Sequence, residues 1–214
     1  MDPLAVSAGG GTWQAGGVAQ EYGPGTALVV VDMQVDFADP AGSLYVTGGE
    51  QVVPLVNAEV DAAVAAGSPV VYTQDWHPEH TPHFAADGGL WPVHCVAGTP
   101  GAELTAGLRV AGGAQRVRKG TGTDDGYSGF SEVDLASGRT ETTVLGALLD
   151  AAGVRRLVVV GLAGDYCVKA TAVDGARRGH DVTVPLAATR FVQLQPGDDE
   201  RARQEMAAAG VRLV

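Results

Sequence analysis

The chain has 214 residues, of which 45% are apolar and 18% charged, and 25 acidic against 14 basic side chains give a formal charge of -11. This composition excludes disorder throughout, and at about 150 residues per domain the length corresponds to one globular domain. All 14 bases follow residue 108, so the first half offers no cationic face for phosphates. We therefore expect no binding to nucleic acid or to a membrane surface.

The first 25 residues differ from the rest of the chain. They hold seven glycines, no base and no apolar periodicity, which predicts a flexible glycine-rich leader over 1–25 and a single domain over 26–214. A secretory signal would need a basic start, and no apolar run approaches the roughly 20 residues of a membrane span. Two cysteines are too few for a disulfide framework. The sequence thus predicts a cytoplasmic protein with free thiols.

From residue 26 onward, short apolar runs alternate with helical stretches. The apolar runs predict strands at residues 27–31, 69–73, 157–160 and 181–184, and residues 115–118, which are not such a run, are a further predicted strand. The predicted helices cover residues 49–66, 141–152, 165–178 and 198–208. Runs that are apolar throughout indicate strands covered on both faces, hence a parallel sheet. The alternation predicts an α/β fold, a doubly wound three-layer sandwich with a mainly parallel central sheet. Two long irregular stretches, 75–107 and 119–140, interrupt it, and such loops usually carry function.

A histidine-rich stretch follows the second predicted strand. Four of the five histidines lie between His77 and His94, next to Asp75 at the end of the strand. Histidine and carboxylate ligands suit one divalent metal ion such as zinc, iron or manganese. Asp75 and His77 are two apart on an extended segment and so point to the same side. The alternative is that these imidazoles are solvated or cap turns; their clustering beside a carboxylate favours a metal site.

Three more reactive side chains lie where open parallel sheets bind ligands, beyond the carboxyl ends of strands. Cys167 follows a glycine-rich turn near the start of a helix, whose free N–H groups lower the pKa of a thiol and can hold an oxyanion. The alternative is a small buried hydrophobe, which is our interpretation of Cys95. Asp32 can deprotonate a thiol, and Lys119 can stabilise the thiolate. Each of these two is otherwise a plausible member of a surface ion pair.

Together these residues belong to motifs that resemble those of the nicotinamidases (pyrazinamidases), cysteine hydrolases of the isochorismatase-like family. The motifs occur in the family's order across about residues 26–214: 31–37 (VDMQVDF), 74–78 (QDWHP), 91–101 (WPVHCVAGTPG), 119–120 (KG), 127–130 (YSGF) and 165–168 (DYCV). The resemblance implies the isochorismatase-like hydrolase fold. It also implies an amidohydrolase of NAD salvage that converts nicotinamide and water to nicotinate and ammonia, and that accepts pyrazinamide.

The resemblance further implies roles for individual residues. Asp32 matches the general base, Lys119 the catalytic lysine and Cys167 the nucleophile. The backbone N–H groups of Ala163 and Cys167 match the oxyanion hole, beside a cis peptide at Leu162-Ala163. The residues that match the enclosure of the pyridine ring are Phe37, Trp91 and Tyr127.

The same resemblance supplies a set of metal ligands. Asp75, His77 and His94 match the family's ligands, and His83, which precedes Phe84, matches a further ligand found in some members. His80 fits a histidine of the commoner D-W-H-P-x-x-H pattern, which need not touch the metal. We expect His83 in the metal site, with His80 as the alternative.

Two positions depart from the family pattern, and both are expected near the substrate. Gly164 stands where threonine is usual, and Val35 where asparagine is usual. They bear on substrate preference rather than on the chemistry.

Rival hypotheses differ in the residues that they need. An isochorismatase proper would lack Cys167 and the metal set, and a carbamoyl-amide hydrolase would need no metal. A metal-binding or thiol-sensing protein would need neither Asp32 nor Lys119 beside the thiol. The expected partner is a small aromatic amide, and whether the chain forms a homo-oligomer is open.

Overall fold

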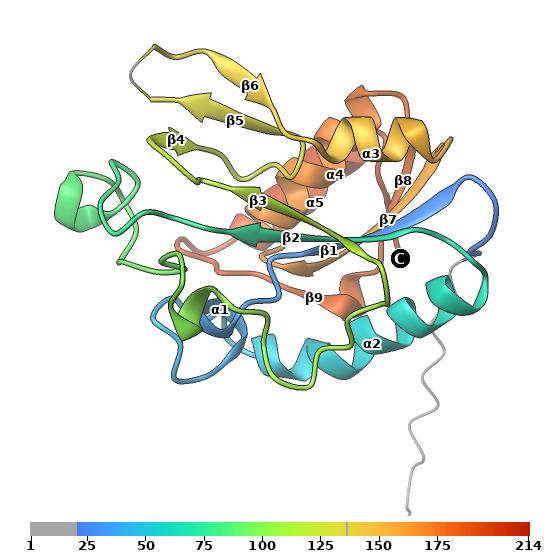
Figure 1. Ribbon diagram of the computed structural model, residues 1–214, viewed down its shortest axis with the longest axis horizontal. Helices are drawn as coiled ribbons and strands as arrows, with labels where there is room; N and C mark the ends of the chain where they lie inside the picture. Colours follow the sequence, from blue (N-terminus) through green and yellow to red (C-terminus); the bar gives the residue numbers. More distant parts are fainter. Residues whose placement is uncertain (1–20, 136) are drawn as a thin grey trace, which may run out of the picture.

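A sheet of seven parallel strands forms the centre of the molecule. The computed structural model describes residues 21–135 and 137–214. The strands run in the order β10-β8-β7-β1-β2-β3, with β9 also paired to β7 (Figure 1). Their bounds are β1 Thr26–Val31, β2 Val70–Asp75, β3 Gln115–Lys119, β7 Arg156–Leu162, β8 Asp181–Val184, β9 Thr189–Arg190 and β10 Arg212–Leu213. The predicted parallel α/β sandwich is confirmed.

Helices cover both faces of this sheet. On one face lie α1 (Val35–Ala38) and α2 (Gly49–Ala65), and on the other α3 (Leu145–Ala151), α4 (Cys167–Arg177) and α5 (Asp198–Ala208). Alternate side chains of β1 enter the two cores: Leu28 and Val30 pack on the α2 side, and Val29 and Val31 on the α4 side. Every residue of β1 and β2 is buried, as an apolar run enclosed by two layers requires.

Residues 119–140, expected to be irregular, contain part of a second sheet. Strands β4 (Asp124–Asp125), β5 (Ser131–Asp134) and β6 (Thr140–Thr142) pair antiparallel beside the main sheet. The helix expected from residue 141 consequently begins at Leu145. Thr143 separates the two elements, because its hydroxyl donates to the Gly129 carbonyl at 2.6 Å and accepts the Leu145 N–H at 3.1 Å. Short single-turn helices at Ala85–Asp87, Pro100–Ala102 and Leu186–Ala188 complete the fold.

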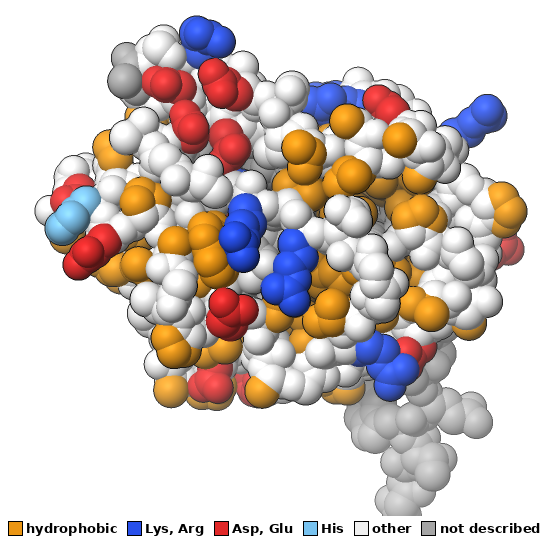
Figure 2. Space-filling model, in the orientation of Figure 1, with side chains coloured by type: hydrophobic (Ala, Val, Ile, Leu, Met, Phe, Trp, Pro, Cys, Tyr) orange, Lys and Arg blue, Asp and Glu red, His pale blue; other side chains and the backbone are white. Residues whose placement is uncertain are grey.

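The end of the expected leader contacts the domain. Tyr22 donates its hydroxyl to Glu59 of α2 at 2.7 Å, and the Gly25 carbonyl accepts the N–H groups of Arg155 and Arg156. Residues 1–20, the rest of that leader, lie outside the described residues. Across 21–135 and 137–214, no helix has the length and apolarity to cross a membrane. The face in Figure 2 mixes basic, acidic and apolar side chains and shows no extended basic patch.

The strand order brings the reactive residues to one edge of the sheet. Because β1, β2 and β3 are parallel neighbours, their carboxyl ends meet at the same edge. Asp32 follows β1, while Asp75 and Lys119 end β2 and β3 and are register partners. β7 lies on the other side of β1, so the turn that leads to Cys167 starts at this edge as well.

The central strand β7 supports a stability prediction. Val159→Ala should lower the free energy of unfolding by about 2 kcal/mol, because the side chain is fully buried and its loss leaves a cavity. Val64→Ala is the matched control, since Val64 on α2 is 52% exposed and should cost less than about 0.5 kcal/mol. Urea denaturation measures both. Equal losses would contradict the assignment of β7 to the core.

Candidate active site

A buried ammonium group lies at the centre of the site. Lys119 Nζ is 2.9 Å from Asp32 Oδ2, contacts Asp75 Oδ1, and is 3.5 Å from Cys167 Sγ. The Lys119 and Asp32 side chains are completely buried, and Cys167 is 6% exposed. The sequence singled out Asp32, Lys119 and Cys167, and the structure places their side chains close to one another.

The backbone of Asp32 turns its carboxylate toward this centre. Asp32 has a φ of +46°, in the left-handed region that aspartate tolerates better than most residues. Its N–H donates to the Thr73 carbonyl at 3.2 Å, and the Thr73 hydroxyl donates to Asp32 Oδ1 at 2.6 Å. Oδ2 is thus left for Lys119. Thr73 is a supporting residue that sequence reasoning missed.

Burial and charge determine which groups carry protons. Burial raises the pKa of Asp32 even though Lys119 opposes the shift. Burial likewise raises the pKa of the Cys167 thiol well above its ordinary value, again against Lys119. For Lys119 burial acts to lower the pKa, but Asp32 and Asp75 outweigh it and hold that pKa well above its ordinary value. The ammonium is therefore charged, and the resting thiol needs a base to lose its proton.

Cys167 is the first residue of α4 and follows a tight turn from β7. As the first residues of a helix have N–H groups without intrahelical acceptors, the Cys167 amide can face a ligand. The Leu162-Ala163 peptide is cis, as the resemblance implies, and the Ala163 carbonyl accepts the Tyr166 and Val168 N–H groups. Ala163 and Cys167 thus lie at the two ends of one hydrogen-bonded turn.

Three histidines form a compact group beside Asp75. One ring nitrogen from each of His77, His83 and His94 lies within 4.8 Å of the other two. Each Nδ1 has an oxygen partner. His77 Nδ1 is 3.2 Å from the Gly120 carbonyl, and His94 Nδ1 is 2.7 Å from the Pro92 carbonyl. His83 Nδ1 is 2.7 Å from Asp125 Oδ1. This arrangement leaves each Nε2 with its lone pair, the state in which histidine binds metals.

The chemistry of this group fits a divalent metal ion. His77 Nε2 is buried and makes no hydrogen bond to any residue in the described part of the chain. Asp75 Oδ2 lies 3.8 Å from His77 Nε2 and 3.9 Å from His94 Nε2. Burial acts to raise the pKa of Asp75, but Lys119, His77 and His94 outweigh it and hold that pKa well below its ordinary value. An ionised carboxylate and three imidazoles are a set that zinc, iron or manganese accept.

His80 lies apart from this group. Its side chain is 80% exposed and pairs with Asp87 at 3.3 Å. The structure therefore brings His83, and not His80, to His77 and His94.

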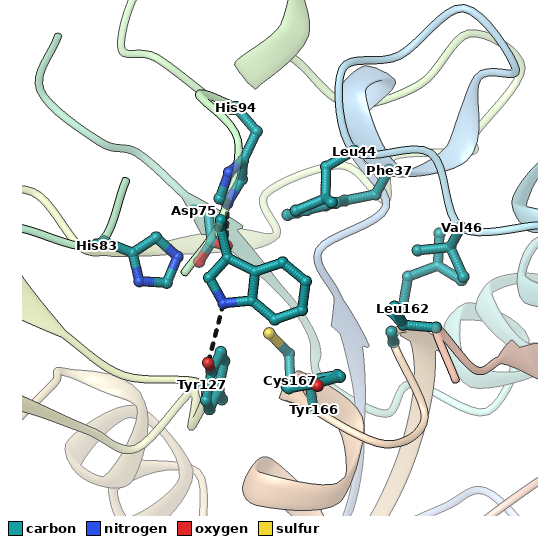
Figure 3. A pocket seen from close by; sticks show the side chains of 13 residues that line it. Phe37, Leu44, Val46, Asp75, His83, His94, Tyr127, Leu162, Tyr166 and Cys167 are labelled. Carbon is teal, nitrogen blue, oxygen red and sulfur yellow. Dashed lines mark hydrogen bonds and ion pairs between the residues drawn. The ribbon is translucent and has the colours of Figure 1, made fainter. Parts of the chain in front are cut away.

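Aromatic side chains enclose a cleft above the sulfur. Figure 3 shows Cys167 with Asp75, His83 and His94 on one side and apolar side chains on the other. The Tyr127 hydroxyl accepts the Trp91 Nε1–H at 3.0 Å, and burial raises the pKa of Tyr127 to about 12. The lining residues are Phe37, Leu44, Val46, Asp75, His83, Trp91, His94, Tyr127, Leu162, Ala163, Tyr166, Cys167 and Val192.

This lining contains the three predicted aromatic residues and several that sequence reasoning missed. Leu44, Val46 and Val192 are aliphatic residues in loops, and no local pattern distinguishes them from other loop residues. Gly164 and Val35 were expected near the substrate, but neither lines the cleft. The Val35 N–H donates to the Glu103 carbonyl, and Gly164 faces Phe191 instead.

Comparison with known proteins places the chain in a family. The isochorismatase domain model matches residues 26–213. The chain belongs to the isochorismatase family. It is 35% identical over 206 residues to the nicotinamidase of Escherichia coli K12, covering 89% of this chain and 94% of that protein. The predictions of an amidohydrolase, and of a nicotinamidase in particular, are confirmed.

Solved structures agree with this assignment. The pyrazinamidase of Pyrococcus horikoshii in complex with zinc has a TM-score of 0.80 and 39% identity, over 89% of this chain and 99% of that one. PnC1 from L. infantum in complex with nicotinate has a TM-score of 0.81 and 38% identity, and the match covers 89% of this chain and 92% of that one.

Asp125 supports the histidine group through His83, and its removal tests that contact. Asp125→Asn should weaken zinc binding by about tenfold, because the carboxylate that orients the ring is lost. Asp124→Asn on the same strand β4 is the matched control and should bind zinc like the unchanged chain. Competition with a chromophoric chelator measures both. Equal affinities in the two variants would contradict a supporting role for Asp125.

Proposed function

We propose that the chain hydrolyses nicotinamide to nicotinate and ammonia with Cys167 as the nucleophile. The observation that carries this proposal is the contact of one buried ammonium, Lys119, with two carboxylates and with the Cys167 sulfur at the floor of an aromatic cleft. A thiol, a carboxylate base and a fixed cation are the groups that covalent amide hydrolysis needs.

In the first half of the reaction the thiol adds to the amide. Asp32 takes the proton of Cys167 while Lys119 balances the negative charge. The sulfur then forms a bond to the carboxamide carbon, and the oxyanion accepts hydrogen bonds from the Ala163 and Cys167 amides. Asp32 returns the proton to the nitrogen, the C–N bond breaks, and ammonia leaves a thioester on Cys167.

The second half releases the acid. A water molecule gives a proton to Asp32 and adds to the thioester carbon, and the same two amides hold the oxyanion. The C–S bond then breaks, and the proton goes from Asp32 to the sulfur. Nicotinic acid departs and Cys167 is again a thiol, so the cycle consumes only water and the amide. In solution the acid passes its proton to ammonia, which gives nicotinate and ammonium.

The metal site is part of the proposal. Asp75, His77, His83 and His94 would hold one divalent ion, for which zinc is our choice because a similar pyrazinamidase is in complex with zinc. When bound, the ion would supply Lewis-acid chemistry suited to the ring nitrogen of the substrate. Phe37, Trp91 and Tyr127 enclose the ring, so pyrazinamide is also a substrate. A carbamoyl-amide hydrolase is disfavoured, since it would need no metal ion and so would not use the three imidazoles.

We further propose that the reaction serves NAD salvage in the cytoplasm. Both cysteines are buried free thiols, and a cysteine nucleophile needs a reducing compartment to remain one. The ligands of this site are small molecules, and neither nucleic acid nor membrane enters the reaction.

Removal of the nucleophile tests the mechanism directly. Cys167→Ala should reduce ammonia release from nicotinamide by at least about a thousandfold, because the covalent path is lost. Its zinc content should stay that of the unchanged chain, since the sulfur is not in the histidine group. Cys95→Ala, at the other buried thiol, is the control and should keep its turnover number. Turnover by Cys167→Ala comparable to that of the control would overturn the assignment.

Variants of His83 and His80 test which of the two histidines is a metal ligand. His83→Ala should lower zinc affinity by about tenfold or more, whereas His80→Ala should leave it unchanged because that ring is exposed. Metal analysis after dialysis against a weak chelator measures both variants. Loss of zinc from His80→Ala alone would reverse the ligand assignment.

A further inference from the structure

The ring of Phe191 occupies the space beside Gly164. A Cβ atom on Gly164 would lie 2.6 Å from Phe191 Cε1 and 2.8 Å from Cδ1 and Cζ, closer than carbon atoms approach. The Gly164 N–H donates to the Arg190 carbonyl at 2.7 Å, so the backbones of the two segments are also joined here. The absence of a side chain at residue 164 is therefore what admits the ring.

The ring is held from a second direction by α5. The guanidinium carbon of Arg203 lies 5.0 Å from the centroid of the Phe191 ring, within the range of a cation–π contact. Arg203 is itself fixed by Asp199, whose Oδ2 lies 3.2 Å from its Nη2. Phe191 is thus clamped between the turn after β7 and α5.

The next residue in the chain reaches the cleft. Val192 lines the cleft, although Phe191 does not. The Val192 N–H donates to Asp165 Oδ1 at 2.9 Å and the Gln193 N–H donates to Asp165 Oδ2 at 2.8 Å. Asp165 is buried in the same turn as Ala163 and Cys167. Val192 and the turn 163–167, which contains the proposed oxyanion-hole amides, are consequently held together by hydrogen bonds.

We propose that Phe191 is a positioning residue for substrate binding, and that Gly164 is required to accommodate it. By filling the space beside Gly164, the ring sets the distance between Val192 and the turn 163–167. That distance determines how closely the cleft fits the aromatic ring of the amide. This inference rests on the proposed function, because the ligand that it concerns is the nicotinamide ring.

Phe191→Ala tests the positioning role in the zinc-loaded chain. The KM for nicotinamide and the dissociation constant of nicotinate should both rise by about tenfold, because Val192 is no longer held against the pyridine ring of the ligand. The turnover number and the rate of Cys167 alkylation by iodoacetamide should change by less than about twofold, since no reacting group is altered. Leu194→Ala, an exposed apolar residue of the same loop, is the matched control and should change none of these values.

Substitution at the glycine provides a reciprocal test. Gly164→Ala should raise the same KM, because its Cβ displaces the Phe191 ring. In the Phe191→Ala background, Gly164→Ala should cause no further rise, since the obstructing ring is gone. Independent effects that multiply in the double variant would overturn the inference, as would an unchanged nicotinate affinity in Phe191→Ala. A wild-type chain that neither binds nicotinate nor releases ammonia would instead refute the proposed function.

Discussion

The buried ammonium of Lys119, held between Asp32 and Asp75, is the interaction on which the rest of the site depends. Two carboxylates buried side by side repel each other, and without a cation one of them would take up a proton. Lys119 satisfies both and contacts the Cys167 sulfur as well. The parallel order β1-β2-β3 makes this arrangement possible, because it delivers one of these charged side chains from the carboxyl end of each strand.

Asp75 connects the two halves of the site. Its Oδ1 contacts Lys119, while its Oδ2 faces the Nε2 atoms of His77 and His94. The carboxylate that helps to hold the ammonium is therefore also the negatively charged member of the histidine group. A change in the position of the β2 end would move the thiol environment and the histidines together, which suits a reaction whose ring and carboxamide must be held at once.

The sequence predicted much of this site, for reasons that are local. Asp32 and Asp75 follow apolar runs, and Lys119 follows a further predicted strand. The rule that ligands lie at the carboxyl ends of parallel strands was enough to bring the three together. The second sheet was missed because its strands are two to four residues long and lack an apolar alternation. Thr73 and Asp125 act through hydrogen bonds to residues 41 and 42 positions away, and no sequence spacing signals such contacts.

By itself the sequence determined the parallel α/β architecture, the family and the identity of the reactive side chains, because strand-end position and short motifs are properties of contiguous residues. The tertiary structure alone separated His83 from His80: the two lie three residues apart in the same loop, but only His83 is packed against His77, whereas His80 is in solvent. It also decided what Gly164 does. Its neighbour Phe191 is 27 residues away in the chain, and their contact exists only because β9 pairs beside β7.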